Sequence, residues 1–120
     1  MLILPPSVRL FVARDVVDMR KAFDGLAALV RETMREDPLS GHLFVFFNRR
    51  GDRVKILWWD RTGYALYAKR LEEGRFTPPC GASGSDAPLR LTSAELSLLL
   101  EGIDLRGAKR AKRYRRDETA

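Results

Sequence analysis

Three runs rich in apolar residues, separated by short polar runs, make up residues 43–71, the most regularly patterned part of the chain. Two short polar runs, residues 50–52 and 60–63, place Gly next to or near Asp. They are typical of tight turns, because Gly supplies a positive φ and Asp hydrogen-bonds its own backbone. The flanking residues are mainly β-branched or aromatic, which suits a pleated sheet. The pattern therefore predicts an antiparallel meander of three strands.

Alternation divides these predicted strands into two faces. The first is apolar and is the predicted core: Leu43, Val45, Phe47, Val54, Ile56 and Trp58. The second mixes aromatic residues with cations: Phe44, Phe46, Lys55, Leu57 and Trp59, then Tyr67 and Lys69 or Tyr64 and Arg70, depending on register. We favour a second core face covered by a helix, because aromatic stripes in small domains usually pack. The alternative is a surface on which bases or a partner's side chains stack, with Trp59 and Tyr67 as the stacking residues.

A first strand and an amphipathic helix are predicted before the meander. Residues 8–13 have the composition of a strand. The apolar stripe of the helix recurs at spacings of three and four and consists of Met19, Phe23, Leu26, Val30 and Met34. Asp15 or Asp18 can cap its start. The helix should end near Glu36, because Pro38 disfavours helical geometry at the residue before it.

Gly25 lies inside this helix at a cost of about 1 kcal/mol relative to Ala, so we expect it where the helix approaches the sheet. After the meander, residues 75–77 can add a short edge strand. Thr92 and Glu95 have the spacing of a capping box. The apolar residues that follow predict a short helix with one apolar face: Leu96, Leu99, Leu100 and Ile103. That helix either closes over the sheet or docks on a partner.

Together these elements predict an α+β fold. Its parts are an antiparallel β-meander of three to five strands, one amphipathic helix packed on it, a short C-terminal helix and a basic tail. Residues 1–105 should form a single domain, with a mobile loop at residues 78–90, whose composition is rich in Gly, Pro and Ser. Residues 106–120 should be a basic, disordered tail, because like charges at such density repel.

The chain has 120 residues and one cysteine, Cys80, so no internal disulfide is expected and a reducing cytoplasm is the simplest location. No apolar run is long enough for a membrane span. The first residues lack the basic start and long apolar region of a signal peptide. These features predict a cytoplasmic protein without a membrane partner.

Positive charge is concentrated in two segments. Net charge is +6 overall, with +4 in residues 49–75 and +5 in residues 106–120. For the tail, contact with nucleic acid is favoured over a solvated segment, because neutralising phosphates releases counterions and contributes affinity. The candidate phosphate contacts are Arg49, Arg50, Arg53, Lys55, Lys69 and Arg70 in the meander and Lys109, Arg110, Lys112, Arg113, Arg115 and Arg116 in the tail. Ion pairing with nearby acids, such as Arg20 with Asp24, is the alternative role for each cation.

Nothing in the sequence predicts a catalytic site. His42 has no His or Cys at metal-ligand spacing, and Cys80 lies in the predicted mobile loop. Five carboxylates could assemble a divalent-metal site of the nuclease kind, although each has a simpler role in a cap, a turn or an ion pair: Asp18, Asp24, Asp52, Asp60 and Glu72. No Gly-rich Walker loop is present. We therefore expect a protein that is not an enzyme and needs no cofactor or metal.

Several strings in the chain are together typical of one family. They are Asp18-Met19-Arg20-Lys21, Phe23-Asp24-Gly25-Leu26, Phe44-Val45-Phe46, Asn48-Arg49-Arg50, Trp59-Asp60, Lys69-Arg70-Leu71-Glu72, Gly74-Arg75-Phe76 and Leu99-Leu100-Glu101-Gly102-Ile103-Asp104, with Lys55, Leu57, Gly63 and Leu66 between them. The chain resembles the TnpB accessory proteins encoded by the second open reading frame of the IS-sixty-six class of bacterial insertion sequences. This family is separate from the RNA-guided nuclease that shares the TnpB name.

The resemblance implies participation in transposition beside a separate DDE-type transposase and another small accessory protein, and it implies no catalysis. Three hypotheses about function remain open. The first is an accessory factor that binds DNA at the transposon end or the target. The second is an adaptor that holds the transposase through the helix at residues 96–103 and through exposed aromatic residues. The third is a metal-dependent nuclease.

Overall fold

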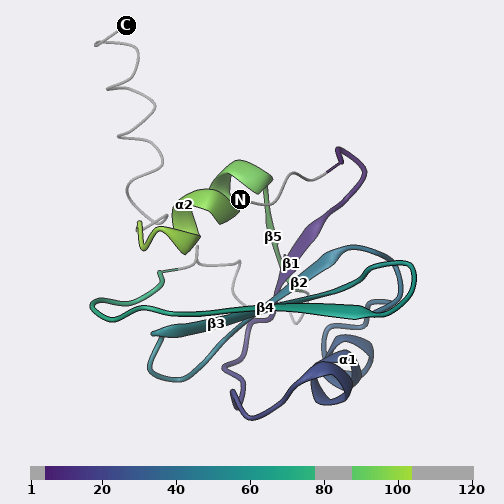
Figure 1. Ribbon diagram of the computed structural model, residues 1–120, viewed down its shortest axis with the longest axis horizontal. Helices are drawn as coiled ribbons and strands as arrows, with labels where there is room; N and C mark the ends of the chain where they lie inside the picture. Colours follow the sequence, from purple (N-terminus) through teal and green to yellow (C-terminus); the bar gives the residue numbers. More distant parts are fainter. Residues whose placement is uncertain (1–4, 78–87, 104–120) are drawn as a thin grey trace, which may run out of the picture.

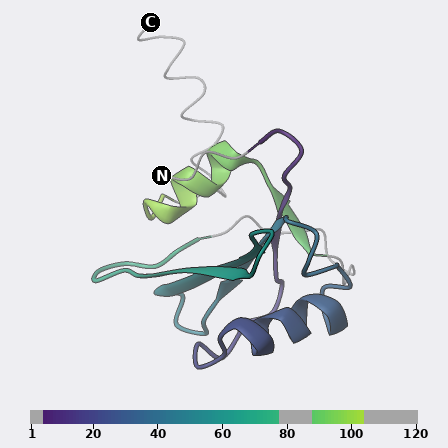
Figure 2. The same cartoon turned by 45° about the vertical axis from the view of Figure 1, so that its right-hand side comes forward.

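The computed structural model describes residues 5–77 and 88–103. This part of the chain forms strands β1 (Leu10–Val12), β2 (Leu43–Phe47), β3 (Arg53–Trp59), β4 (Tyr64–Arg70) and β5 (Leu89–Leu91), and helices α1 (Phe23–Glu32) and α2 (Ser93–Leu100). The strands form one sheet in the order β4-β3-β2-β1-β5. Helix α1 covers one face of the sheet and α2 lies over the other (Figure 1, Figure 2).

The sheet is mixed rather than wholly antiparallel. β2, β3 and β4 form the predicted antiparallel meander. β1, however, pairs parallel with β2, in the register Leu10 to Leu43. The prediction was incomplete here because α1 carries the chain back from the end of β1 to the start of β2, and such a crossover makes neighbouring strands parallel. β5, which the sequence did not predict, pairs antiparallel with β1 at the far edge.

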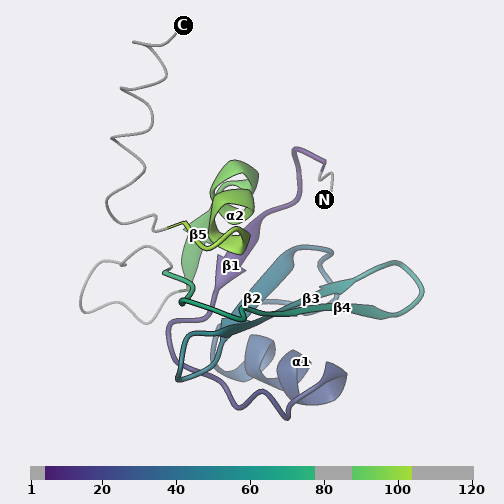
Figure 3. The same ribbon diagram turned by 60° about the vertical axis from the view of Figure 1, so that its left-hand side comes forward.

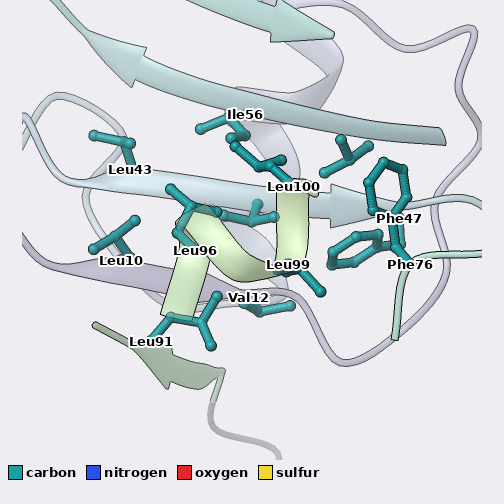
Figure 4. Packing of buried hydrophobic residues seen from close by; sticks show 12 residues of the cluster. Leu10, Val12, Leu43, Phe47, Ile56, Phe76, Leu91, Leu96, Leu99 and Leu100 are labelled. Carbon is teal, nitrogen blue, oxygen red and sulfur yellow. The ribbon is translucent and has the colours of Figure 1, made fainter. Parts of the chain in front are cut away.

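One hydrophobic core, which we call the α2-side core, lies between α2 and the first face of the sheet (Figure 4). Its buried members from the meander are residues predicted for the core: Leu43, Val45, Phe47, Val54 and Ile56, with Trp58 partly buried against them. Leu96, Leu99 and Leu100 of α2 pack on them. The capping box that starts α2 is confirmed, because Glu95 N–H donates to Thr92 Oγ1 at 3.1 Å and Thr92 N–H donates to Glu95 Oε1 at 2.9 Å.

The second face of the sheet is a core face as well. Phe44, Phe46 and Leu57 are fully buried there, and Leu26 and Val30 of α1 pack over them. We call this cluster the α1-side core. The covered-face interpretation is therefore confirmed for this part of the sheet. Phe11 of β1 stacks on Phe44, with the ring centroids 5.7 Å apart.

Helix α1 begins at Phe23, later than the apolar stripe from Met19 had indicated. Its N-cap is Ala22, which makes no side-chain capping bond. Asp18 is not the cap, because its carboxylate accepts bonds from the backbone N–H and the guanidinium of Arg20 instead. Phe23 is 45% exposed, so it is not a core residue. A Cβ at Gly25 would meet the side chain of Lys21, not the sheet, so the expected close approach is also wrong.

The tight turn between β3 and β4 has a different left-handed residue from the one expected. Arg61, not Gly63, has a positive φ, at 57°. Residues 75–77 form no strand, contrary to expectation, although Phe76 is buried in the α2-side core. The loop around Cys80 and the basic tail lie outside the described residues. Neither described helix has the length and apolar content needed to cross a membrane.

Candidate nucleic-acid interface

The turn between β2 and β3 is held by the side chain of Asn48. Its Oδ1 accepts the Arg53 N–H at 3.0 Å, and its Nδ2 donates to Asp52 Oδ1 at 2.7 Å. Gly51 has φ +77°, which favours glycine at this position. This short, clamped turn leaves Arg49 and Arg50 exposed at its tip.

The segment that follows β4 lies beside this turn (Figure 3). Leu71 N–H donates to the Asp52 carbonyl at 2.8 Å, and Phe76 N–H donates to the Gly51 carbonyl at 2.8 Å. A Cβ built at Gly51 would lie 3.7 Å from the Cβ of Arg75. Two segments that are about twenty residues apart in sequence therefore share one end of the sheet.

Five exposed arginines gather at this end, and we call them the arginine cluster: Arg49, Arg50, Arg53, Arg70 and Arg75. Among the described residues, the cluster forms one ion pair, between Arg70 and Glu72 at 3.2 Å. Four of the five were predicted as phosphate contacts from the sequence. Arg75 was missed, because only the backbone pairing of Phe76 with Gly51 brings it to the turn.

One carboxylate in the turn stays ionised beside these arginines. The pKa of Asp52 is lowered, chiefly by the hydrogen bond from Asn48 and also by the charges of Arg50 and Arg53. Asp52 thus offsets part of the positive charge and helps to hold the turn. Glu72 and Glu73 are the other acids of this end, and both are exposed.

Lys55, a predicted phosphate contact, has partners inside the protein. Its Nζ donates to the carbonyl oxygens of Met19 and Lys21, at 2.7 and 2.8 Å. These bonds fasten the segment before α1 to the sheet, and the layer formed by α1 ends there. The position of Lys55 therefore serves the fold.

Lys69 also has a partner inside the protein, on the opposite face of the sheet. Its Nζ donates to the Leu100 carbonyl at 2.7 Å. Lys55 and Lys69 therefore do not join the exposed arginines as one contact surface. Outside the cluster, the guanidinium of Arg90 lies over the Phe11 ring, 5.5 Å from its centroid.

The two proposed stacking residues do not share a face. The register pairs Trp59 with Tyr64, and their rings meet edge to face at 5.2 Å between centroids. Tyr67 packs partly buried against the α2-side core. The register thus selects Tyr64 and Arg70, rather than Tyr67 and Lys69, as the β4 residues on the same face as Trp59.

The carboxylates considered for a nuclease site are not brought together. In residues 5–77 and 88–103, no three His, Cys, Asp or Glu side chains are grouped so that they could hold a metal ion. Asp52 lies in the β2–β3 turn, whereas Asp60 lies in the β3–β4 turn at the other end of β3. The tail cations proposed as contacts lie outside the described residues: Lys109, Arg110, Lys112, Arg113, Arg115 and Arg116.

Comparisons with known proteins place this geometry in context. The family model described as IS66 Orf2 like protein matches residues 8–110. The uncharacterized protein y4hO of Sinorhizobium fredii (strain NBRC 101917 / NGR234) is 43% identical over 100 residues, which cover 83% of this chain and 84% of the relative. The uncharacterized protein y4jC of the same strain is 39% identical over 105 residues, covering 87% and 86%. No solved structure gives a significant match.

Proposed function

The chain belongs to the IS66 Orf2 like family, and on that premise we propose that it is a non-catalytic accessory protein of transposition that binds DNA through the arginine cluster. Its DNA would be the transposon end or the target. We further propose that it assists a separate DDE-type transposase, together with another accessory protein of the same element.

One observation carries the DNA-binding part of this proposal. The β2–β3 turn, the paired strands β3 and β4, and the segment after β4 each contribute arginines to one end of the sheet. Such exposed cations neutralise backbone phosphates and bind DNA without reading its sequence. The tail, residues 106–116, would add affinity of the same kind.

An adaptor role through α2 has less support. The apolar residues that would meet a transposase, Leu96, Leu99 and Leu100, are buried in the α2-side core. A partner would have to displace the helix from the sheet to reach them. We therefore place the contact with nucleic acid at the arginine cluster and assign no partner to α2.

Fluorescence anisotropy with a labelled DNA duplex tests the proposal. The logarithm of the association constant should fall linearly with the logarithm of salt concentration, by about 0.9 for each phosphate engaged. The double variant Arg49→Gln/Arg50→Gln should bind more weakly and reduce this slope by up to about 1.8. A chain ending at residue 105 should also bind more weakly.

The matched control is Arg9→Gln/Arg61→Gln, which removes two exposed charges from the opposite end of the sheet. It should retain most of the affinity and the slope. Equal weakening by both double variants would contradict the assignment to the cluster. The absence of binding by the unchanged protein at low salt, or tighter binding of RNA than of duplex DNA, would contradict the function itself.

A further inference from the structure

Arg53 and Arg70 lie directly opposite each other on β3 and β4. The bond from Leu71 N–H to the Asp52 carbonyl flanks this pair, which makes it a non-hydrogen-bonded pair, the type whose side chains lie closer. Both side chains are exposed. Like charges that face each other across two strands destabilise a sheet. An anion between the two guanidinium groups would remove this repulsion.

A hollow of about 450 Å³ lies at this pair. Its lining includes Arg53 and Arg70 together with Met19, Lys55 and Glu72. It is present because the layer formed by α1 ends where Lys55 holds the segment before the helix, so the sheet beyond that point is uncovered. The hollow has room for a phosphate group with its waters. Four cations line it against one carboxylate. Lys55 and Lys69 already donate to backbone carbonyls, so Arg53 and Arg70 are the exposed cations that can bind an anion there.

That carboxylate, Glu72, holds Arg70 loosely. Nη2 and Nε of Arg70 both donate to the same oxygen, Oε2, at 3.2 and 3.3 Å. Charge-assisted bonds of this kind are normally about 2.7–2.9 Å long. The Arg20 pair with Asp18 is tighter, since it uses both carboxylate oxygens and reaches 2.7 Å. The Glu72 side chain is 80% exposed, so it can swing away into solvent.

We propose that Arg53 and Arg70 together bind one phosphate of the DNA backbone, and that Glu72 occupies Arg70 until this phosphate displaces it. The inference rests on the proposed function and adds to it a shared phosphate site with an internal competitor. Two non-bridging oxygens of a phosphodiester suit the planar fork of an arginine better than a single carboxylate oxygen does.

Anisotropy titrations of the full chain with the same duplex test both parts. Glu72→Gln should tighten binding by about 2- to 5-fold, the range expected when a weak surface ion pair no longer competes. Glu73→Gln is the matched control, because it removes the adjacent exposed charge without removing an ion pair with a described residue. In an Arg70→Gln background, Glu72→Gln should tighten binding no more than Glu73→Gln does.

The salt slope counts the phosphates. Arg53→Gln/Arg70→Gln should lower it by about 0.9 in total, as for one phosphate, rather than by about 1.8. A loss near 1.8, or equal effects of Glu72→Gln and Glu73→Gln, would overturn the inference while DNA binding itself stands. If the unchanged protein binds no DNA, the proposed function fails, and this inference fails with it.

Discussion

Lys69 of β4 donates a hydrogen bond to the carbonyl oxygen of Leu100, the last residue of α2, over 2.7 Å. The final carbonyls of a helix lack partners within the helix, and its C-terminus carries partial negative charge. The last turn of α2 contains no basic residue of its own. A lysine from the sheet therefore supplies the cation that α2 lacks.

Lys69→Met should lower the free energy of unfolding by about 1.5–3 kcal/mol, because a bond to a charged group is lost and a carbonyl loses its partner. Urea denaturation measures this loss. Relative to the unchanged protein, amide exchange in the variant should accelerate more in α2 than in α1. DNA affinity should change little. Lys21→Met is the control, since its exposed side chain donates no hydrogen bond to a described residue. It should stay within about 0.5 kcal/mol of the unchanged protein.

Lys55→Met should also destabilise the fold, by about 1.5–3 kcal/mol. The variant removes both bonds to the carbonyls of Met19 and Lys21. Amide exchange should accelerate first in the segment before α1. An effect as small as that of Lys21→Met would show that these bonds contribute nothing to stability.

Asn48→Ala should loosen the β2–β3 turn and cost about 1–2 kcal/mol of stability. It removes the acceptor for Arg53 N–H and the donor to Asp52. Because the bond from Asn48 is the main cause of the lowered pKa of Asp52, that pKa should rise toward its usual value, as NMR titration of the carboxyl carbon would show. Arg49→Ala, a change at the exposed neighbouring residue, should leave the Asp52 pKa low.

Arg61→Asn should stabilise the protein by about 0.5–1 kcal/mol, because Asn tolerates the left-handed backbone region better than Arg does. Arg61 has φ 57° in the turn between β3 and β4. Thermal unfolding compares the variant with Arg61→Ala, which removes the same charge without relieving the strain. If both variants change stability equally, backbone strain at this residue is not the cause.

Acid should weaken the segment before α1 through Asp18. Bonds from the Arg20 side chain, and then from its backbone N–H, lower the pKa of Asp18 to about 2 from a usual value of 3.8. A carboxylate with a lowered pKa contributes stability above its unfolded pKa and loses that contribution as pH falls through its folded pKa. The difference in stability between the unchanged protein and Asp18→Asn should therefore shrink between pH 4 and pH 2.

NMR titration of the Asp18 carboxyl measures the same pKa directly. Arg20→Gln should move it back toward 3.8, though incompletely, because the backbone bond remains. A midpoint near 3.8 in the unchanged protein would contradict the ion pair.

Features with short-range causes were predictable from the sequence. The period-two alternation in β2 and β3 identified both faces of the meander, because successive side chains of a strand must point to opposite sides. The capping box of Thr92 and Glu95 was also predictable, because both partners lie within one helical turn. The start of α1 was not predictable in this way, because the Asp18 carboxylate accepts hydrogen bonds from Arg20 and does not cap the helix amides.

The chemistry of the cations needed the tertiary structure. Lys55 and Lys69 have the same charge and a similar sequence context to the exposed arginines, but their partners lie 36 and 31 residues away. No pattern among neighbouring residues indicates a partner so far away in the sequence. Arg75 shows the converse case, because backbone pairing across the chain brings it to the β2–β3 turn.

The sequence by itself determined the meander, its apolar faces and the surplus of positive charge, because side-chain periodicity and charge are properties of the chain alone. Only the tertiary structure decided the parallel pairing of β1 with β2, the register that sets Arg53 opposite Arg70, and which cations remain exposed. These depend on how α1 crosses the sheet and on which distant carbonyls a lysine can reach, and neither is encoded in neighbouring residues.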